Sequence, residues 1–370
     1  MAEAEPATET PSFDPEPPGK TQRRVAAVLV VVLVGSLVVH IVTSKLSKED
    51  SGPEAEPLPT VTPVLDAAVT GSSNPLDAER AFGYLSAICE LGPRPSGSVG
   101  MREQQELVAT HFEEHGAEVR RQTFRVRNPL GGPRVAMTNI IARWRLDEPD
   151  RVLLCAHYDT RPLPDRDPNP IARRRGRFIG ANDGASGVAA LMELAHLLAV
   201  YDGPLGVDVV LFDGEELVYV DRRDPYFLGS RYFAEAYKKR KPLPDGPPWR
   251  YRAAILLDMV GDADLQLYQE RYSYRNEKTR PLVLEVWSTA QRLGVEEFIP
   301  RVKHTVRDDH LALQRYGDIP AIDIIDFDYP AWHTESDTPR RCSGDSLAKV
   351  GWVVWEWLLS QRANPVADAS

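Results

Sequence analysis

Cysteine is scarce in this chain of 370 residues, which contains Cys89, Cys155 and Cys342 and no other. None of the three forms a Cys-x-x-Cys pair, so neither a disulfide framework nor a cysteine-based zinc site is indicated. One pair could still form a disulfide in an oxidising compartment, and the sequence does not say which. The chain also lacks an Asn-x-Ser/Thr sequon, so N-glycosylation gives no clue to the compartment.

An excess of positive charge is absent as well. The formal net charge is −10 at pH 7, whereas a nucleic-acid-binding protein normally presents a basic face. We therefore expect no nucleic-acid partner. The composition, 42% hydrophobic and 26% charged residues, is ordinary for a globular protein. The length allows one large domain or two small ones.

A long apolar run occurs over residues 25–42. It has about the length needed to cross a bilayer core, and it starts farther from the N-terminus than the apolar part of a typical cleaved signal peptide, its main competitor. We expect an uncleaved, single-pass transmembrane anchor over residues 25–43. Lysine and arginine precede it, whereas acids offset the lysines after it. This bias places the N-terminus in the cytoplasm and the bulk of the chain outside it.

The segments around this run are poor in residues that could build a core. Residues 1–24 are rich in Pro, Glu and Thr, and we expect a disordered cytoplasmic tail there. Residues 44–75 have a similar composition and are expected to be a flexible linker. Periodic sequence follows, which predicts one folded domain over residues 76–362 and a short tail over residues 363–370.

Apolar residues recur at helical spacing over residues 76–91 and 101–115, and strand and helix patterns alternate after them. The alternation predicts an α/β domain with a single open, mostly parallel mixed sheet flanked by helices. Strands are expected at 138–144, 151–156, 207–212, 253–260 and 321–327. Further helices are expected at 185–200, 229–239, 281–293, 309–316 and 343–359.

Polar clusters stand at the ends of these strands and at the start of one helix. They contain His157 and Asp159, Asp183, Glu215 and Glu216, Asp258, and Trp332 with His333. Any one of them could cap a helix or fill a structural role, but their recurrence favours a shared site. In open α/β sheets the ligand site lies beyond the carboxyl ends of the strands. Mixed carboxylate and imidazole side chains at such a site are typical of zinc.

Glu215 and Glu216 are the most informative pair. Adjacent carboxylates repel each other, and this repulsion disfavours a purely structural role for the pair. On an extended segment, neighbouring side chains point to opposite sides. One of them can then bind a cation while the other faces the substrate as a proton carrier. A bound dication also removes the repulsion between them.

Seven motifs occur in the order H-Y-D, A-N-D-G-A-S-G, F-D-G-E-E, Y-F-L-G-S-R-Y-F-A, L-L-D-M-V-G, D-D-H and W-H-T. In this order they resemble the zinc aminopeptidase and glutaminyl cyclase superfamily, over roughly residues 76–360. The F-D-G-E-E motif, the double aspartate before His310 and the tryptophan before His333 resemble the animal-type glutaminyl-peptide cyclotransferases. The aminopeptidases more usually carry tyrosine at the position of Trp332 and a single aspartate before the equivalent of His310.

The resemblance implies a role for each matching residue. The implied zinc ligands are Asp183, Glu216 and His333. Glu215 would shuttle the proton, Asp258 and Asp308 would form the acid network beside it, and Trp332 would shape the substrate pocket. His157 and Asp258 are the positions that complete a second metal site in the peptidases.

The implied reaction is the cyclisation of N-terminal glutamine of peptides or proteins to pyroglutamate, with release of ammonia and one zinc ion per chain. The alternative is a membrane-anchored zinc aminopeptidase with two zinc ions. A third reading, a non-catalytic binding ectodomain, is disfavoured because all candidate ligands and Glu215 are present.

Two features depart from the resemblance. The loop L-V-Y-V-D-R-R-D-P-Y-F-L after Glu216 lacks the pocket tryptophan of the animal cyclases, and Tyr219, Tyr226 or Phe227 could replace it. A proline- and arginine-rich insertion spans residues 161–177. A solvated surface loop is expected there, in preference to a part of the cleft wall.

Overall fold

The computed structural model describes residues 73–240 and 249–361 of the chain. The predicted tail (1–24), the transmembrane anchor (25–43) and the C-terminal tail (363–370) lie outside the described residues, as does the linker apart from its last three positions. These assignments, and the membrane location that depends on them, stay predictions. In the part that is described, no helix is both long enough and apolar enough to cross a membrane.

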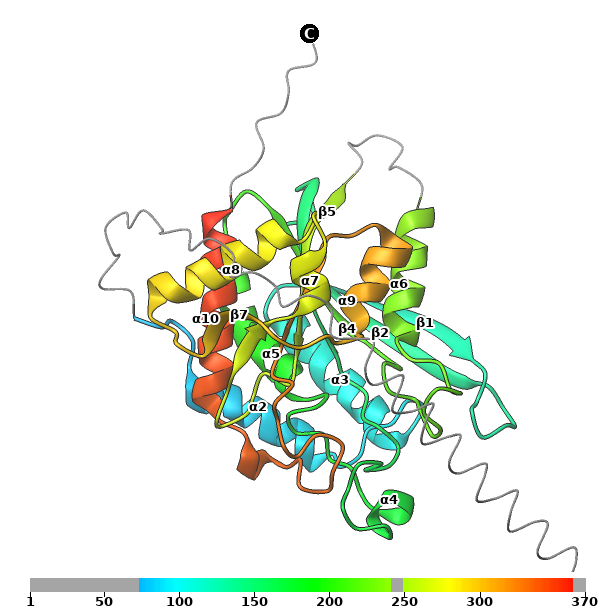
Figure 1. The fold of residues 1–370 in the computed structure, drawn as a ribbon. Coiled ribbons are helices and arrows are strands. Elements are labelled where there is room, and N and C mark those ends of the chain that lie inside the picture. The colour runs from blue at the N-terminus through cyan, green and yellow to red at the C-terminus, as the bar shows by residue number, and fades with distance from the viewer. Residues whose placement is uncertain (1–72, 241–248, 362–370) are drawn as a thin grey trace, which may run out of the picture. The chain divides into compact units, whose positions relative to one another are not determined.

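A six-stranded mixed sheet carries the domain (Figure 1), in the order β1-β2-β4-β3-β5-β8. Strands β4, β3, β5 and β8 run parallel to one another, whereas β2 pairs with β4, and β1 with β2, in antiparallel fashion. The α/β class and the helix-flanked mixed sheet are therefore confirmed. The strands of this sheet are β1 (Glu118–Val126), β2 (Val135–Trp144), β3 (Asp150–His157), β4 (Gly206–Phe212), β5 (Arg250–Asp258) and β8 (Ala321–Ile325).

A second, two-stranded sheet pairs β6 (Leu267–Gln269) with β7 (Phe298–Val302). The helices are α2 (Ala78–Glu90), α3 (Val99–Glu114), α4 (Ala172–Arg175), α5 (Ser186–Leu198), α6 (Leu228–Lys239), α7 (Arg271–Arg275), α8 (Arg280–Leu293), α9 (Asp309–Ala312) and α10 (Gly344–Ser360). The helix expected over residues 309–316 is instead the short α9 followed by a π-helical turn, Leu313–Gly317.

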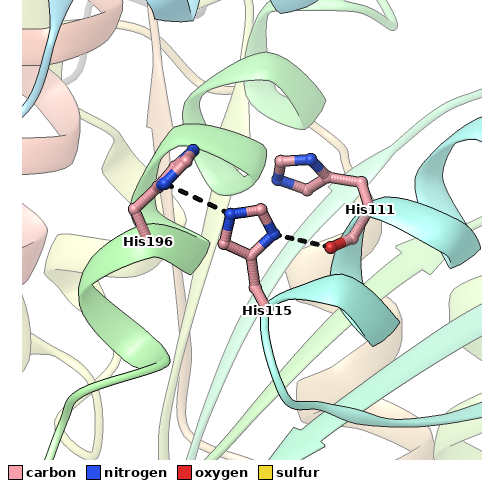
Figure 2. Close-up of side chains that lie close together, drawn as sticks. All are labelled: His111, His115 and His196. Atoms are coloured by element: carbon pink, nitrogen blue, oxygen red, sulfur yellow. Dashed lines mark hydrogen bonds between the residues drawn. The ribbon is translucent and has the colours of Figure 1, made fainter.

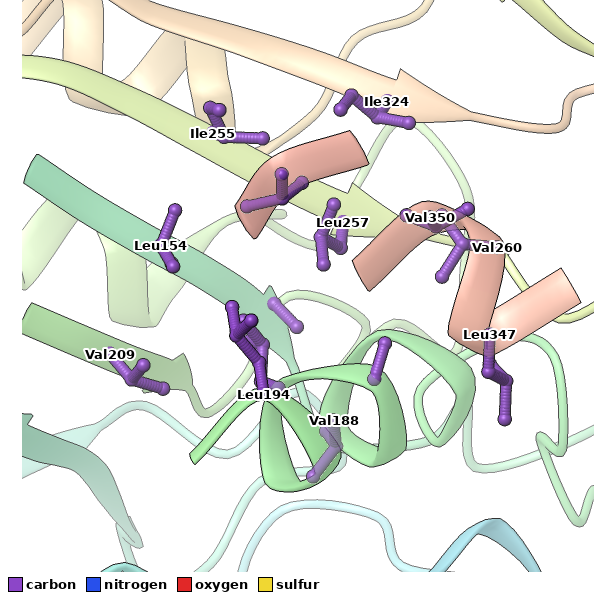
Figure 3. Packing of buried hydrophobic residues seen from close by; sticks show 14 of the residues in the cluster. Leu154, Val188, Leu194, Val209, Ile255, Leu257, Val260, Ile324, Leu347 and Val350 are labelled. Atoms are coloured by element: carbon purple, nitrogen blue, oxygen red, sulfur yellow. The ribbon is translucent and has the colours of Figure 1, made fainter. Parts of the chain in front are cut away.

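Helices cover both faces of the sheet, which explains why its central strands are continuous apolar runs. Along β3 the side chains alternate: Leu154 packs into the core under α5 and α10, whereas Leu153 packs into a separate core under α6. Figure 3 shows the first core, where Leu154 and Leu257 of the sheet meet Val188 and Leu194 of α5. The helices therefore cover both faces of the sheet, and loops follow the carboxyl ends of its parallel strands.

All three cysteines lie in the described part, and each is a buried free thiol. No disulfide joins Cys89, Cys155 and Cys342 there, so the pairing left open by the sequence does not occur in this structure.

Gly187, in the first turn of α5, sets how closely this helix approaches the sheet. A Cβ atom there would overlap the Leu257 carbonyl oxygen and lie 2.9 Å from the Ala156 Cβ. We expect Gly187→Ala to lower the free energy of unfolding by about 1–3 kcal/mol, because the helix must move away from β5. Thermal unfolding followed by circular dichroism measures this.

Gly83 is the matched control, because it is an exposed glycine of α2 whose Cβ would meet nothing within 4 Å. Gly83→Ala should leave stability unchanged or raise it by up to about 1 kcal/mol, since alanine favours the helix. Equal losses in both variants would show that close packing at Gly187 is not the cause.

Candidate metal centre

The side chains singled out in the sequence meet at the carboxyl ends of the parallel strands. His157 and Asp258 are the last residues of β3 and β5, and Glu215 and Glu216 follow β4 within one turn. Asp183 lies just before α5, and Asp308 is the N-cap residue of α9. Trp332 and His333 lie in the connection that follows β8. Their convergence confirms the geometric expectation, because parallel strands deliver their following loops to one edge of the sheet.

Asp183, Glu216 and His333 form the first cluster. His333 Nε2 lies 2.7 Å from Glu216 Oε1 and 3.4 Å from Asp183 Oδ2. All three side chains are buried, and one potential ligand atom of each lies within 4.8 Å of the others. The backbone of His333 is left-handed, with φ +57°, so a strained turn presents this imidazole to the two acids.

Buried carboxylates hold the backbone of this cluster. Asp159 accepts hydrogen bonds from the backbone N–H groups of Glu215 and Glu216, both at 3.0 Å. Asp337 accepts from the N–H groups of Asn182 and Asp183, at 2.8 and 3.1 Å. The candidate ligands are thus positioned through their main chain. The sequence placed Asp159 in a polar cluster without a specific role and did not single out Asp337, because nothing in their neighbourhood along the chain shows what their carboxylates contact.

The segment that starts at Arg161 closes the cluster from the other side. Asp165 Oδ1 lies 2.9 Å from His333 Nδ1, and the Arg161 N–H donates to Glu216 Oε2 at 3.0 Å. A carboxylate on the second nitrogen of an imidazole is the usual partner of a metal-binding histidine. The expectation of a solvated loop over residues 161–177 is therefore wrong for its first residues. Ion pairs of Asp165 with His333 and of Arg161 with Glu216 fix this part of the loop.

The charge balance of the first cluster favours a bound cation. Burial opposes a charged imidazole, yet Glu216, Asp165 and Asp183 together raise the pKa of His333 to about 9. Asp183 Oδ2 finds no hydrogen-bond partner among the described residues. Two carboxylates and one imidazole at these distances match the donor set of a zinc site with an open position. The residues present therefore fit zinc.

A second cluster shares Asp183 with the first. His157 Nε2 lies 3.3 Å from Asp183 Oδ1 and 3.1 Å from Asp258 Oδ1. His157, Asp183 and Asp258 also bring one ligand atom each within 4.8 Å of one another. The geometry alone thus offers places for one ion or for two, with Asp183 between them.

A pocket of about 390 Å³ opens onto the first cluster. Glu215, Asp258, Asp308 and Trp332 line it, and so do the three residues of the cluster. The Arg166 guanidinium lies over the Trp332 ring, 3.9 Å from its centroid, a cation–π contact that fixes the indole as a wall.

The loop after Glu216 also contributes to the pocket. Of the aromatic residues proposed to replace the missing tryptophan, Tyr226 and Phe227 line the pocket. Tyr219 does not appear among the described residues that line it. The pocket is thus bounded by Tyr226 and Phe227 on one loop and by Trp332 on another.

Glu215 and Asp308 form a buried acid pair beside the cluster. Burial, with the charge of Glu216, raises the pKa of Glu215 well above its ordinary value. Burial, with the charges of Asp258 and Asp309, also raises the pKa of Asp308 well above its ordinary value. The charge of Asp308 acts on Glu215, and carboxyl groups that interact in this way titrate together. Such a group can exchange a proton with a molecule in the pocket.

The Asp159 carboxylate gives a specific prediction. Asp159→Asn replaces one acceptor oxygen with an N–H donor, which would face a backbone N–H group of Glu215 or Glu216. We expect zinc affinity to fall by about 10–100-fold, as for other changes behind a metal ligand. Competition with a chromogenic chelator measures this.

Asp326→Asn is the matched control, because the Asp326 carboxylate also accepts from two backbone N–H groups, those of Gln266 and Asp328, and is buried. It should cost stability without weakening zinc. Equal zinc affinities in the two variants would contradict the positioning role of Asp159.

Comparison with known proteins identifies the family of this chain. The sequence profile of peptidase family M28 matches residues 139–358. The chain belongs to peptidase family M28. Within the family it is a homologue of the glutaminyl cyclases: the crystal structure of Fimbriiglobus ruber glutaminyl cyclase shares 42% sequence identity, with a TM-score of 0.74, and the match covers 79% of this chain and 97% of that one. The predicted superfamily is thus confirmed.

The relatives of this M28 protein include proteins named as aminopeptidases and proteins named as cyclotransferases. A leucine aminopeptidase precursor from Bacteroides thetaiotaomicron shares 30% identity, with a TM-score of 0.71, over 78% of this chain and 99% of that chain. The glutaminyl-peptide cyclotransferase-like protein of Mus musculus is 25% identical over 71% of this chain and 70% of its own length. The family therefore includes both activities that the sequence left open.

Proposed function

We propose that this M28 protein cyclises the N-terminal glutamine of peptides or proteins to pyroglutamate and releases ammonia. The observation that carries the proposal is the pairing of two adjacent buried acids: Glu216 belongs to the cluster with Asp183 and His333, and Glu215 lines the pocket beside that cluster. The likeness to Fimbriiglobus ruber glutaminyl cyclase supports the same reaction.

For this reaction the protein must mainly position the substrate and transfer a proton. The α-amine of the substrate attacks its own γ-amide carbon, so the nucleophile is already tethered and its effective concentration is high. A new C–N bond closes the ring, and the bond to the amide nitrogen breaks. One proton must pass from the attacking amine to the departing ammonia.

Glu215 is the group placed to move this proton, first as base and then as acid. Asp258 and Asp308 line the same pocket and would orient the proton transfer. Asp183, Glu216 and His333 would hold the zinc ion, which when bound supplies a Lewis acid for the γ-carbonyl. Trp332, held by Arg166, would form the wall against which the glutamine side chain lies.

Ammonia release from a glutamine-initiated peptide tests the proposal. The same peptide with an acetylated N-terminus is the control, because it keeps the γ-amide and lacks the nucleophile. We expect release from the free peptide and none from the blocked one. Fast hydrolysis of leucine anilide without any ammonia release would refute cyclisation.

The specific observation in favour of the aminopeptidase alternative is the intact second cluster of His157, Asp183 and Asp258. A peptidase must generate hydroxide at neutral pH, and a pair of metal ions does so by lowering the pKa of a bridging water. Elemental analysis of the parent beside a His157→Ala variant separates the two, because the peptidase alone needs an ion at His157. His157→Ala should lower the zinc count in the first case alone.

A further inference from the structure

Three histidines gather at the end of α5 that is remote from the candidate metal centre. His111 and His115 are one turn apart on α3, and His196 lies in the last turn of α5 (Figure 2). One ring nitrogen of each lies within 4.8 Å of one nitrogen of each of the others. Because α5 rises about 1.5 Å per residue, His196 is about 15 Å along the helix from Ser186, which follows the Asp183 turn.

Hydrogen bonds to carbonyl groups fix the protonation of two of these rings. His111 Nε2 lies 2.8 Å from the Met192 carbonyl oxygen, and His115 Nδ1 lies 2.7 Å from the His111 carbonyl oxygen. A carbonyl oxygen can accept a hydrogen bond and cannot donate one, so these two nitrogens carry the protons. The other nitrogen of each neutral ring, Nδ1 of His111 and Nε2 of His115, then keeps its lone pair.

His196 can adopt either tautomer. Its Nε2 lies 2.7 Å from the Tyr84 hydroxyl, a group that can donate or accept, and its Nδ1 lies 3.2 Å from His115 Nε2. With the proton on Nε2, His196 donates to Tyr84, and two nitrogen lone pairs face each other. Two nitrogen ligands of a tetrahedral zinc ion, each 2.0–2.1 Å from the metal, are about 3.3 Å apart. The observed spacing therefore equals one edge of such a site.

We propose that His111, His115 and His196 form a second metal site, which takes a divalent transition-metal ion such as Zn²⁺. Imidazole nitrogens suit zinc, copper and nickel. Three protein ligands leave one position for water, and the half-buried His115 and His196 leave the site open to solvent. The ion would tie α3 to α5, with Tyr84 of α2 as an outer partner.

The surroundings are compatible with a cation. Arg80, the basic side chain whose charge acts on His111 and His196, is paired with Glu193 at 2.6 Å, so its charge is partly offset. Burial lowers the pKa of His111 to about 4, and burial together with Arg80 lowers that of His196. Both shifts favour the neutral imidazole, which is the form that binds a metal ion.

The test uses the full chain, stripped of metal, incubated with zinc sulfate and freed of unbound ions by gel filtration. Elemental analysis should find about one fewer zinc ion in the double variant His115→Asn/His196→Asn than in the parent. His304→Asn, a histidine outside the three-histidine cluster, is the control and should keep the parental count. Because the result is a difference, it does not depend on how many ions the candidate metal centre holds.

Equal zinc counts in the parent and the folded double variant would overturn the proposal. If the double variant does not fold, Tyr84→Phe decides, because it keeps all three imidazoles and removes only the hydrogen bond to His196. We expect zinc affinity at the three-histidine cluster to fall by about 10–100-fold in this variant, measured by competition with a chelator. An unchanged affinity there would count against the site.

Discussion

Replacing Glu215 with glutamine is expected to lower kcat by about 10²–10⁴-fold while zinc stays bound. Glutamine has nearly the same shape as glutamate, so the pocket should keep its form. The glutamine side chain cannot accept a proton, however. The buried Glu215 carboxyl lies beside the cluster of Asp183, Glu216 and His333 and is not one of its three members. Steady-state kinetics with a glutamine-initiated peptide, alongside elemental analysis, measure both effects.

Glu216→Gln is the matched comparison, one residue away and with the same chemical change. Glu216 lies 2.7 Å from His333 in the first cluster, so this variant should lose zinc as well as turnover. Both variants should lose turnover, but Glu215→Gln should keep zinc and Glu216→Gln should lose it. Parental turnover in Glu215→Gln, or loss of zinc from it, would show that the two roles are assigned wrongly.

Asp183→Asn is expected to remove most of the zinc bound at the candidate metal centre and, with it, the activity. Asp183 contributes to both clusters, at 3.4 Å from His333 and 3.3 Å from His157. An amide is a far weaker zinc ligand than a carboxylate, because its oxygen lacks the negative charge of the carboxylate. The loss should therefore occur whether the enzyme uses one ion or two, which elemental analysis and activity assays will record together.

Asp165→Asn gives a graded control for this prediction. Its carboxylate lies behind His333 and would not touch the ion, so zinc affinity should fall by about 10–100-fold and remain measurable. Asp183→Asn should be the more severe of the two by a wide margin. A milder effect at Asp183 than at Asp165 would contradict the ligand assignment.

The sequence predicted the strands of the site well because they are buried on both faces. Such strands are continuous apolar runs, and a polar residue marks their end; His157 and Asp258 are the last residues of β3 and β5. The edge strand β1 was missed, since its sequence E-V-R-R-Q-T-F-R-V is rich in charge and largely exposed. Edge strands need to bury little, so their hydrophobic pattern is weak.

The partners of the candidate ligands could not be predicted from the sequence. Asp337 lies 155 positions from Asn182 along the chain. No local sequence pattern predicts that its carboxylate accepts a hydrogen bond from the Asn182 N–H group. Asp165 sits in a segment rich in proline and arginine, a composition typical of surface loops. The pocket wall that it helps to form exists only through contacts with His333 and Arg161.

The distances along the chain between the three residues of the first cluster bear on when metal can bind. Glu216 and His333 are 117 positions apart, and each follows a different strand of the finished sheet. An unfolded chain cannot hold both near one ion, so zinc binds the native state and raises its stability by mass action. Chelation should therefore lower the melting temperature, and zinc availability during synthesis should govern how much folded protein accumulates.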